Sequence, residues 1–403
     1  MTQSSQTPAP HAARRARRTR LIFVVLIWLL IGLESAAGPG PLSHSPGAAG
    51  LGAFVGMLAA IQLQQLVTLA LGRSGGIAPT MFFLGSGRWL AARRLGALTL
   101  VLRTVPLIPL QAGQAIVAGP ALRLRLLLGG LCRIGSVIAL GVLLIMQGDF
   151  AVVFAGLGAL FYAFLLLIGG PRKPGTLSWM IFSAPFADPL LLQGLARGRA
   201  EVRAERALLG ARYAEAREAL SADPLPVPLT PDRVVAARAW AAVEIGEGRY
   251  EDARRTLDAV RESGPSEQVP AGELLLARTM LFSLEDGTTA REEALPAAQA
   301  AIATAQQRMP RLFAATEVLA TLALLNGRGQ EALEMAREGL RRATDLQIRA
   351  HTLCTLAGAQ AVTGDFPAAR ATLAEARALA PELARVATVE RLVGELPLTR
   401  DRV

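Results

Sequence analysis

Two adjacent glutamines and a threonine, Gln64, Gln65 and Thr68, interrupt a long apolar run of the sequence. In an α-helix Gln64 and Thr68 are four residues apart, so they share one face. Their amide and hydroxyl groups form hydrogen bonds, but none of them carries a charge or titrates near neutral pH. This spacing predicts either hydrogen bonding across a helix bundle or the remnant of a site that once held a metal.

The other residues that commonly bind metals are scattered. The three histidines, His11, His44 and His351, lie far apart in a polar tail, a Pro/Gly-rich loop and a helical region. Cys132 and Cys354 lie in different halves of the chain and form no Cys-x-x-Cys motif. We therefore expect no histidine-based zinc site, no disulfide framework and no bound cofactor.

The apolar runs that would hold the glutamines are concentrated before residue 170. Each is close to the ~20 residues that a helix needs to cross a bilayer. We predict four membrane spans, which cover residues 21–37, 51–71, 126–147 and 150–170. The first is interpreted as an uncleaved signal anchor, preceded by a basic, disordered tail at residues 1–20.

The distribution of arginine predicts the orientation of these spans. Arginines cluster before the first span, between the second and third, and after the fourth, whereas the other two loops carry no lysine or arginine. The positive-inside rule then places both termini in the cytoplasm, and we expect an integral protein of a bacterial inner membrane.

The net charge of +10 is explained by the same arginines. A basic chain can bind nucleic acid, but no nucleic-acid-reading motif is present. We therefore expect membrane lipid, and not nucleic acid, as the partner of the basic residues.

Arginines interrupt the region between the second and third spans, so this region is not predicted to cross the membrane. Residues 98–104, LTLVLRT, are β-prone and partly alternate in polarity, which predicts a short strand or hairpin. Gly85 and Gly87 are expected to mark a turn.

This order of features, over about residues 50–185, resembles the site-2 proteases, a family of intramembrane zinc metallopeptidases. In that family a helix with His-Glu-x-x-His is followed by a Gly-x-Gly strand and a Pro-Leu-Gly-Gly segment. Residues 85–87 (GSG) and 109–113 (PLQAG) resemble the last two motifs. Counting back from Gly85 without gaps places the metal motif on residues 64–68, QQLVT, and the third ligand falls at about Trp179.

These substitutions would remove the chemistry of the family. A neutral amide at Gln64 and a hydroxyl at Thr68 are poor zinc ligands, and Trp179 is none. Gln65 has no carboxylate with which to take a proton from a metal-bound water. If the resemblance holds, the chain is a pseudoprotease, with no metal or catalytic residue at the degenerate positions Gln64, Gln65, Thr68 and Trp179. Ordinary packing of a helix bundle remains the alternative.

The second half of the chain, residues 195–403, contains a repeated pattern. Glycines at 248, 327 and 364 each precede a small residue by five positions, and further small residues follow at helical spacing. This frame resembles the tetratricopeptide repeat, in which small residues let two helices pack closely. The segment at about 270–306 is predicted to form another helix pair. The resemblance implies an α-solenoid with a concave groove for a protein or peptide partner. The residues expected along the groove, unless they form a solvated face, are Arg238, Glu244, Arg278 and Arg349.

The sequence thus predicts a mainly all-α protein with a membrane domain at residues 21–194, including a small β segment, and repeats at 195–403. Three functions follow. The first is a membrane-anchored, non-catalytic relative of the site-2 proteases that binds a protein through its repeats. The second is an active intramembrane metalloprotease with unusual ligands, although Glu34 and Asp149 lie only at the ends of spans. The third is a plain membrane-anchored repeat scaffold unrelated to proteases.

Overall fold

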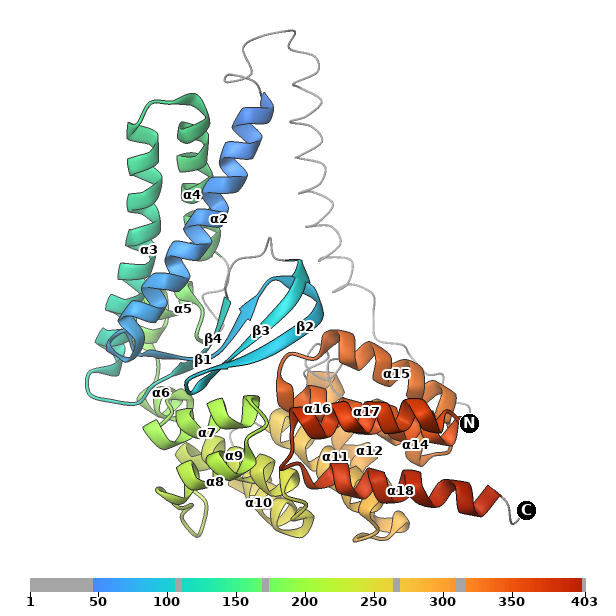
Figure 1. The fold of residues 1–403 in the computed structure, drawn as a ribbon. Coiled ribbons are helices and arrows are strands. Elements are labelled where there is room, and N and C mark those ends of the chain that lie inside the picture. Colours follow the sequence, from blue (N-terminus) through green and yellow to red (C-terminus); the bar gives the residue numbers. More distant parts are fainter. Residues whose placement is uncertain (1–45, 106–110, 169–173, 264–268, 309–316, 401–403) are drawn as a thin grey trace, which may run out of the picture. The chain divides into compact units, whose positions relative to one another are not determined.

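A computed structural model describes residues 46–105, 111–168, 174–263, 269–308 and 317–400 (Figure 1). These residues are mostly helical and include one four-stranded sheet. The predicted tail at 1–20 and the predicted span at 21–37 lie outside the described residues. The chain divides into two compact units, and the described residues of the first are 46–67, 130–168 and 176–178.

Three helices are long and apolar enough to cross a membrane: α2 (Pro46–Leu71), α3 (Leu122–Met146) and α4 (Phe150–Ile168). They coincide within a few residues with the predicted spans at 51–71, 126–147 and 150–170. None of the three contains an acidic residue, and apolar side chains occupy most of each helix.

Within the first unit these helices approach closely at glycines. A Cβ atom added at Gly56 of α2 would lie 1.8 Å from the carbonyl oxygen of Ala155 in α4, and one at Gly52 would lie 2.3 Å from that of Ala151. Gly52 and Gly56 form a G-x-x-x-G pair, which typically brings apolar helices into backbone contact. Small side chains therefore determine how α2 and α4 pack.

The second unit contains a mixed sheet of β1 (Ile77–Leu84), β2 (Ser86–Leu95), β3 (Leu98–Val105) and β4 (Gln111–Ile116). The strand order is β2-β3-β1-β4, with β1 parallel to β3 and the other neighbours antiparallel. The strand predicted at residues 98–104 is confirmed as β3.

The sequence predicts a short strand or a hairpin in this region, and the structure shows a hairpin of β2 and β3. β2 and β3 turn at Gly96, whose φ is +60°. Gly85, with φ +90°, changes the direction of the chain between β1 and β2, which are not neighbours because β3 lies between them. The predicted turn at Gly85 and Gly87 is therefore a bend and not the hairpin turn.

After the apolar helices, the chain forms short elements that lead into the helical region. These are α5 (Leu177–Phe182), the 3₁₀ turn η3 (Ala184–Phe186) and α6 (Pro189–Leu195). In the second unit, Trp179, Met180 and Leu192 pack on Ile77 of β1 and Leu126 of α3. The start of α3 and the short elements thus share one apolar core.

The helical region consists of consecutive helices that pack in pairs. The pairs are α7 (Arg199–Leu209) with α8 (Tyr213–Ser221), α9 (Val234–Gly246) with α10 (Tyr250–Ser263), α11 (Val269–Asp286) with α12 (Arg291–Arg308), α14 (Val318–Leu325) with α15 (Gly329–Arg342), and α16 (Leu346–Val362) with α17 (Phe366–Leu379). α18 (Ala384–Arg400) follows the last pair and contacts α11, α16 and α17. The helix pair predicted at about 270–306 is confirmed as α11 and α12.

The predicted glycine and alanine positions take the expected roles. Gly248, Gly327 and Gly364 each lie between the helices of a pair and have φ values of +74°, +74° and +91°. Five residues after each glycine comes a fully buried alanine: Ala253, Ala332 and Ala369. Positive φ favours glycine, and a small buried side chain lets the paired helices approach.

The sheet and the helix pairs belong to the same unit and pack on each other (Figure 1). Trp89 of β2 packs against the apolar core that α7, α8, α16, α17 and α18 share. Nε of Arg206 in α7 donates to the carbonyl oxygen of Pro79 at 2.9 Å. An arginine of β3, Arg103, donates to the carbonyl oxygen of Ala343 at 2.9 Å.

Candidate functional site

Gln64 lies inside the first unit and is 4% exposed. The hydroxyl of Tyr162 in α4 donates a hydrogen bond to its Oε1 atom at 2.6 Å. An unsatisfied amide is costly in an apolar environment, so this hydrogen bond stabilises the contact between α2 and α4. The sequence predicts that Gln64 hydrogen-bonds across a helix bundle or belongs to a former metal site, but it does not identify Tyr162 as the partner.

The same unit contains a buried cation that sequence reasoning missed. Arg133 is the twelfth residue of α3 and is 4% exposed. Its guanidinium is close enough to Tyr162 for the two side chains to interact electrostatically. The sequence does indicate an unusual charge here, because Arg133 is the only charged residue between Arg125 and Asp149. We call Gln64, Tyr162 and Arg133 the polar cluster; one residue comes from each apolar helix.

The remaining predicted site residues lie in different settings. Gln65 is half-buried, and its Oε1 atom has no hydrogen-bond partner among the described residues. Thr68 is buried and belongs to the second unit, since the boundary between the units falls after Val67. Trp179 is also in the second unit, in the apolar core beneath α5 and α6.

The chemistry of these groups suits binding better than hydrolysis. Amides, hydroxyls and a guanidinium can hold a carbonyl, a hydroxyl or an anion, whereas hydrolytic zinc needs imidazole, thiolate or carboxylate ligands. Across the described ranges, no three His, Cys, Asp or Glu side chains gather where they could hold a metal ion.

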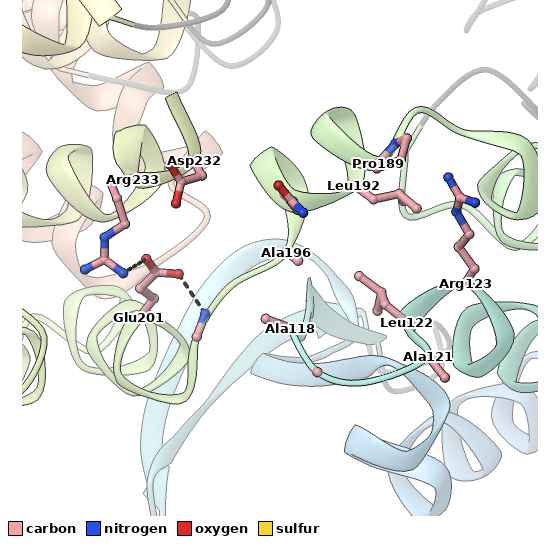
Figure 2. Close-up of a pocket in the computed structure, with 13 residues that line it drawn as sticks. Ala118, Ala121, Leu122, Arg123, Pro189, Leu192, Ala196, Glu201, Asp232 and Arg233 are labelled. Atoms are coloured by element: carbon pink, nitrogen blue, oxygen red, sulfur yellow. Dashed lines mark hydrogen bonds and ion pairs between the residues drawn. The ribbon is translucent and has the colours of Figure 1, made fainter. Parts of the chain in front are cut away.

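The second unit contains a cavity of about 520 Å³ between the start of α3, α6 and the start of the helix pairs (Figure 2). Arg123 lies on its α3 side, and Glu201, Asp232 and Arg233 lie on the opposite side. Glu201 accepts a hydrogen bond from the backbone N–H of Gly198 at 2.8 Å and pairs with Arg233 at 3.6 Å. Its carboxylate therefore serves to cap α7.

The interior of the helix pairs contains a buried ion pair that we call the Arg385 cluster, formed by Arg385, Glu285, Phe282, Thr355 and the backbone of His351. Arg385 of α18 is fully buried and binds both carboxylate oxygens of Glu285 in α11, at 2.6 and 3.0 Å. It also donates to the carbonyl oxygen of His351 and the hydroxyl of Thr355, and it lies 3.8 Å above the Phe282 ring. Burial opposes the charge of Arg385, but Glu285 more than offsets this and raises its pKa.

His351 contributes to this interior through packing. Its ring stacks on Phe282 with centroids 5.0 Å apart, and its Nε2 atom lies 3.5 Å from the hydroxyl of Tyr213. Burial, followed by the charges of Arg278 and Arg385, lowers the pKa of His351 and keeps the imidazole neutral.

The residues predicted to line an open groove are instead engaged inside the second unit. Arg278 is buried and binds Glu317 through two hydrogen bonds of 2.7 and 3.2 Å. Arg349 lies 5.1 Å above the Trp89 ring of β2. The prediction of a solvated face is wrong for Arg278, which is buried against Glu317, and Arg349 packs on the sheet instead of lining an open groove.

Glu244 of α9 is also buried, next to Thr256 and Arg249. Burial raises its pKa to about 7, and the Thr256 hydroxyl, which donates to the carboxylate, opposes this shift. The carboxyl group therefore changes its charge near neutral pH.

Comparison of the chain with protein-family models, curated proteins and solved structures finds no match. The local geometry of the polar cluster and of the helix pairs is therefore the basis for a functional interpretation.

Proposed function

We propose that this protein is a membrane-anchored, non-catalytic relative of the site-2 proteases that binds a protein partner through its helical repeats. The observation that carries the proposal is the joining of two parts in one chain. Three helices suited to crossing a membrane are followed by a body of helix pairs that packs on a sheet. We infer that both termini and the helix pairs are in the cytoplasm of a bacterium, since arginines flank the spans on that side.

Two features support descent from the protease family. A four-stranded sheet occupies the region where the resemblance requires a Gly-x-Gly strand, and α2 carries Gln64 at the predicted ligand position with its side chain buried. The hydrogen bond from Tyr162 gives Gln64 a structural role that needs no metal. Ordinary packing of a helix bundle explains the same contact, and metal content separates both of these interpretations from an active metalloprotease.

Metal analysis of the full-length protein, purified in detergent without chelators, addresses catalysis. We expect zinc well below one ion per chain and no cleavage of membrane-peptide substrates, because amides and hydroxyls bind zinc poorly. Stoichiometric zinc that falls after the substitution Gln64→Ala would favour the active metalloprotease instead.

The helical repeats resemble tetratricopeptide units, and their turn glycines and buried alanines support that likeness. Arg278 and Arg349 of the inner helices α11 and α16 are engaged within the unit, so we propose that a partner binds elsewhere on the helix pairs. Two hollows are the candidates, one of about 250 Å³ lined by residues of α10 and α11, and one of about 420 Å³ between α17 and α18.

Photo-crosslinking in cells tests this surface. A photoreactive amino acid replaces Glu251 in the first hollow or Arg370 in the second, and Arg93, which is exposed on β2, serves as the control position. We expect a discrete product with one protein from a hollow and none from position 93. The same products from all three positions, or none from the hollows, would contradict the proposal.

A further inference from the structure

The surface of α5, η3 and α6 carries large apolar side chains that are exposed in the described part of the chain. Phe182, Phe186 and Leu191 are 53%, 86% and 43% exposed. Their neighbours on the inner side, including Trp179, Met180 and Leu192, are buried in the core of the same elements. The segment therefore has two apolar faces, one packed on protein and one open. We call Phe182, Phe186 and Leu191 the outer apolar face.

This face is tied to the beginning of a candidate membrane helix. Nη2 of Arg123, in the first turn of α3, donates to the carbonyl oxygen of Ala187 at 2.7 Å. Leu126 of α3 packs in the core beneath the segment, while Leu124 and Leu128 on the same turns are about half exposed. Figure 2 shows Arg123 on the same side of the cavity as Pro189 and Leu192 of α6.

The length of α3 determines how deep in a bilayer its first turn, which carries Arg123, would lie. Its 25 residues span roughly 37 Å at 1.5 Å per residue. The hydrocarbon core of a bilayer is about 30 Å thick, so at least one terminal turn extends into the headgroup layer. Arg123 is in that first turn, and an arginine there can place its guanidinium among lipid phosphates while its stem stays apolar. The segment bound to Arg123 is then at headgroup depth as well.

We propose that the outer apolar face of α5, η3 and α6 inserts into the headgroup and upper acyl region of the bilayer that α3 crosses, as an interfacial anchor for the second unit. The occupant of this face is lipid. Phenylalanine and leucine on short helices that lie along a surface are suited to this boundary, and Arg123 adds attraction to anionic headgroups. The proposal rests on the membrane anchoring proposed above and adds a contact site to it.

Site-directed spin labelling of the full-length protein in liposomes of zwitterionic and anionic phospholipid tests the inference. The label is placed by Phe186→Cys in a Cys132→Ala background, which removes the exposed native thiol and leaves Cys354 buried. Two further labels serve as references. Native Cys132, ten residues into α3, reports the bilayer interior, and Val227→Cys, at a side chain that is 98% exposed, reports water. Accessibility to apolar oxygen is compared with accessibility to a polar nickel chelate.

We expect the ratio of oxygen accessibility to nickel-chelate accessibility to be several-fold higher for the label at 186 than for the label at 227. The ratio at 186 should be lower than the ratio for the label at 132. The interfacial anchor would be overturned if the label at 186 has the same accessibility ratio as the label at 227 while the label at 132 reports the bilayer interior. In that case the membrane anchoring would remain intact. A label at 186 shielded from both reagents would also overturn it, because a protein would then cover the face. If the label at 132 also matches 227, the membrane anchoring itself fails.

Discussion

At the scale of single residues, this protein places full charges in positions that water does not reach. A buried ion pair attracts strongly, but each ion has lost its hydration, so the pair is sensitive to the loss of one partner. Arg385 and Glu285 are such a pair, and each hydrogen-bonds to the other through two atoms. Removing one partner leaves the other charge buried without compensation.

The Arg385 cluster gives a prediction about stability. We expect Arg385→Met and Glu285→Leu each to lower the free energy of unfolding by about 3–5 kcal/mol, because each leaves one buried charge. The double variant should be at least as stable as either single variant, since no charge remains unpaired. Denaturant unfolding of the full-length protein, followed by tryptophan fluorescence, measures this, and simple additivity of the two losses would refute it.

Glu244 gives a prediction about pH. Its pKa in the folded state is raised to about 7, above the value of about 4.3 for an unperturbed glutamate. Between these values the folded protein binds more protons than the unfolded chain, so stability should fall as pH rises from 4.3 to 7. Glu244→Gln should remove this dependence and melt at a higher temperature than the parent above pH 7.

The exposed Glu251 on the next helix provides a matched control. Glu251→Gln should leave the pH dependence of the melting temperature unchanged. If Glu244→Gln and the parent keep the same difference in melting temperature at pH 5 and pH 8, the titration of Glu244 does not contribute.

At the scale of elements, local patterns and distant contacts differ in how well the sequence predicts them. The apolar runs predict α2, α3 and α4 within a few residues, because hydrophobic length is a local property. The turn glycines and buried alanines are likewise local. The parallel pairing of β1 with β3 depends on sheet topology and was not predicted, although β3 itself was.

In the candidate site, too, local features can be predicted from the sequence and contacts between distant residues cannot. The sequence predicts a hydrogen-bonding or former metal-site role for Gln64, because a polar amide within an apolar helix is costly unless it is paired. Arg133 was not predicted, although it is a lone charge in an apolar run. Tyr162 and Glu285 were not predicted, because their partners are 98 and 100 residues away in sequence. One unaligned sequence gives no information on such pairs.

The packing of α2 on α4 gives a prediction about an element. A side chain at Gly56 would overlap the backbone of Ala155, so Gly56→Leu should force the helices apart and lower the melting temperature of the full-length protein. Gly135 in α3 has open space around the same added atom and provides the control. Gly135→Leu should leave the melting temperature nearly unchanged, and equal effects of the two substitutions would count against close helix packing.

At the scale of the whole molecule, the second unit joins a sheet and helix pairs that sequence analysis had assigned to different domains. The contact of Arg349 with Trp89 and the hydrogen bonds of Arg206 and Arg103 hold them together. A shared core predicts cooperative unfolding. Consequently, an isolated fragment from residue 195 onwards would lack the sheet that contacts α7, α15 and Arg349 of α16.

This cooperativity can be measured with two fluorescent labels in a Cys132→Ala background. One is attached at Arg93→Cys in the sheet and the other at Glu251→Cys in the helix pairs. We expect the same denaturant midpoint from both positions, and Trp89→Ala should lower both midpoints together. Separate midpoints, or a shift confined to the sheet, would mean that the two parts unfold independently.

The order in which the chain is synthesised gives the Arg385 cluster a kinetic consequence. Glu285 precedes Arg385 by 100 residues, and translation at about 5–20 residues per second separates them by roughly 5–20 s. During that interval α2, α3 and α4 have already left the ribosome, whereas Arg385, the partner of the Glu285 carboxylate, has not yet been synthesised. The described helices α12 and α14 to α17 are therefore synthesised before this ion pair can form, and the pair forms only when α18 emerges.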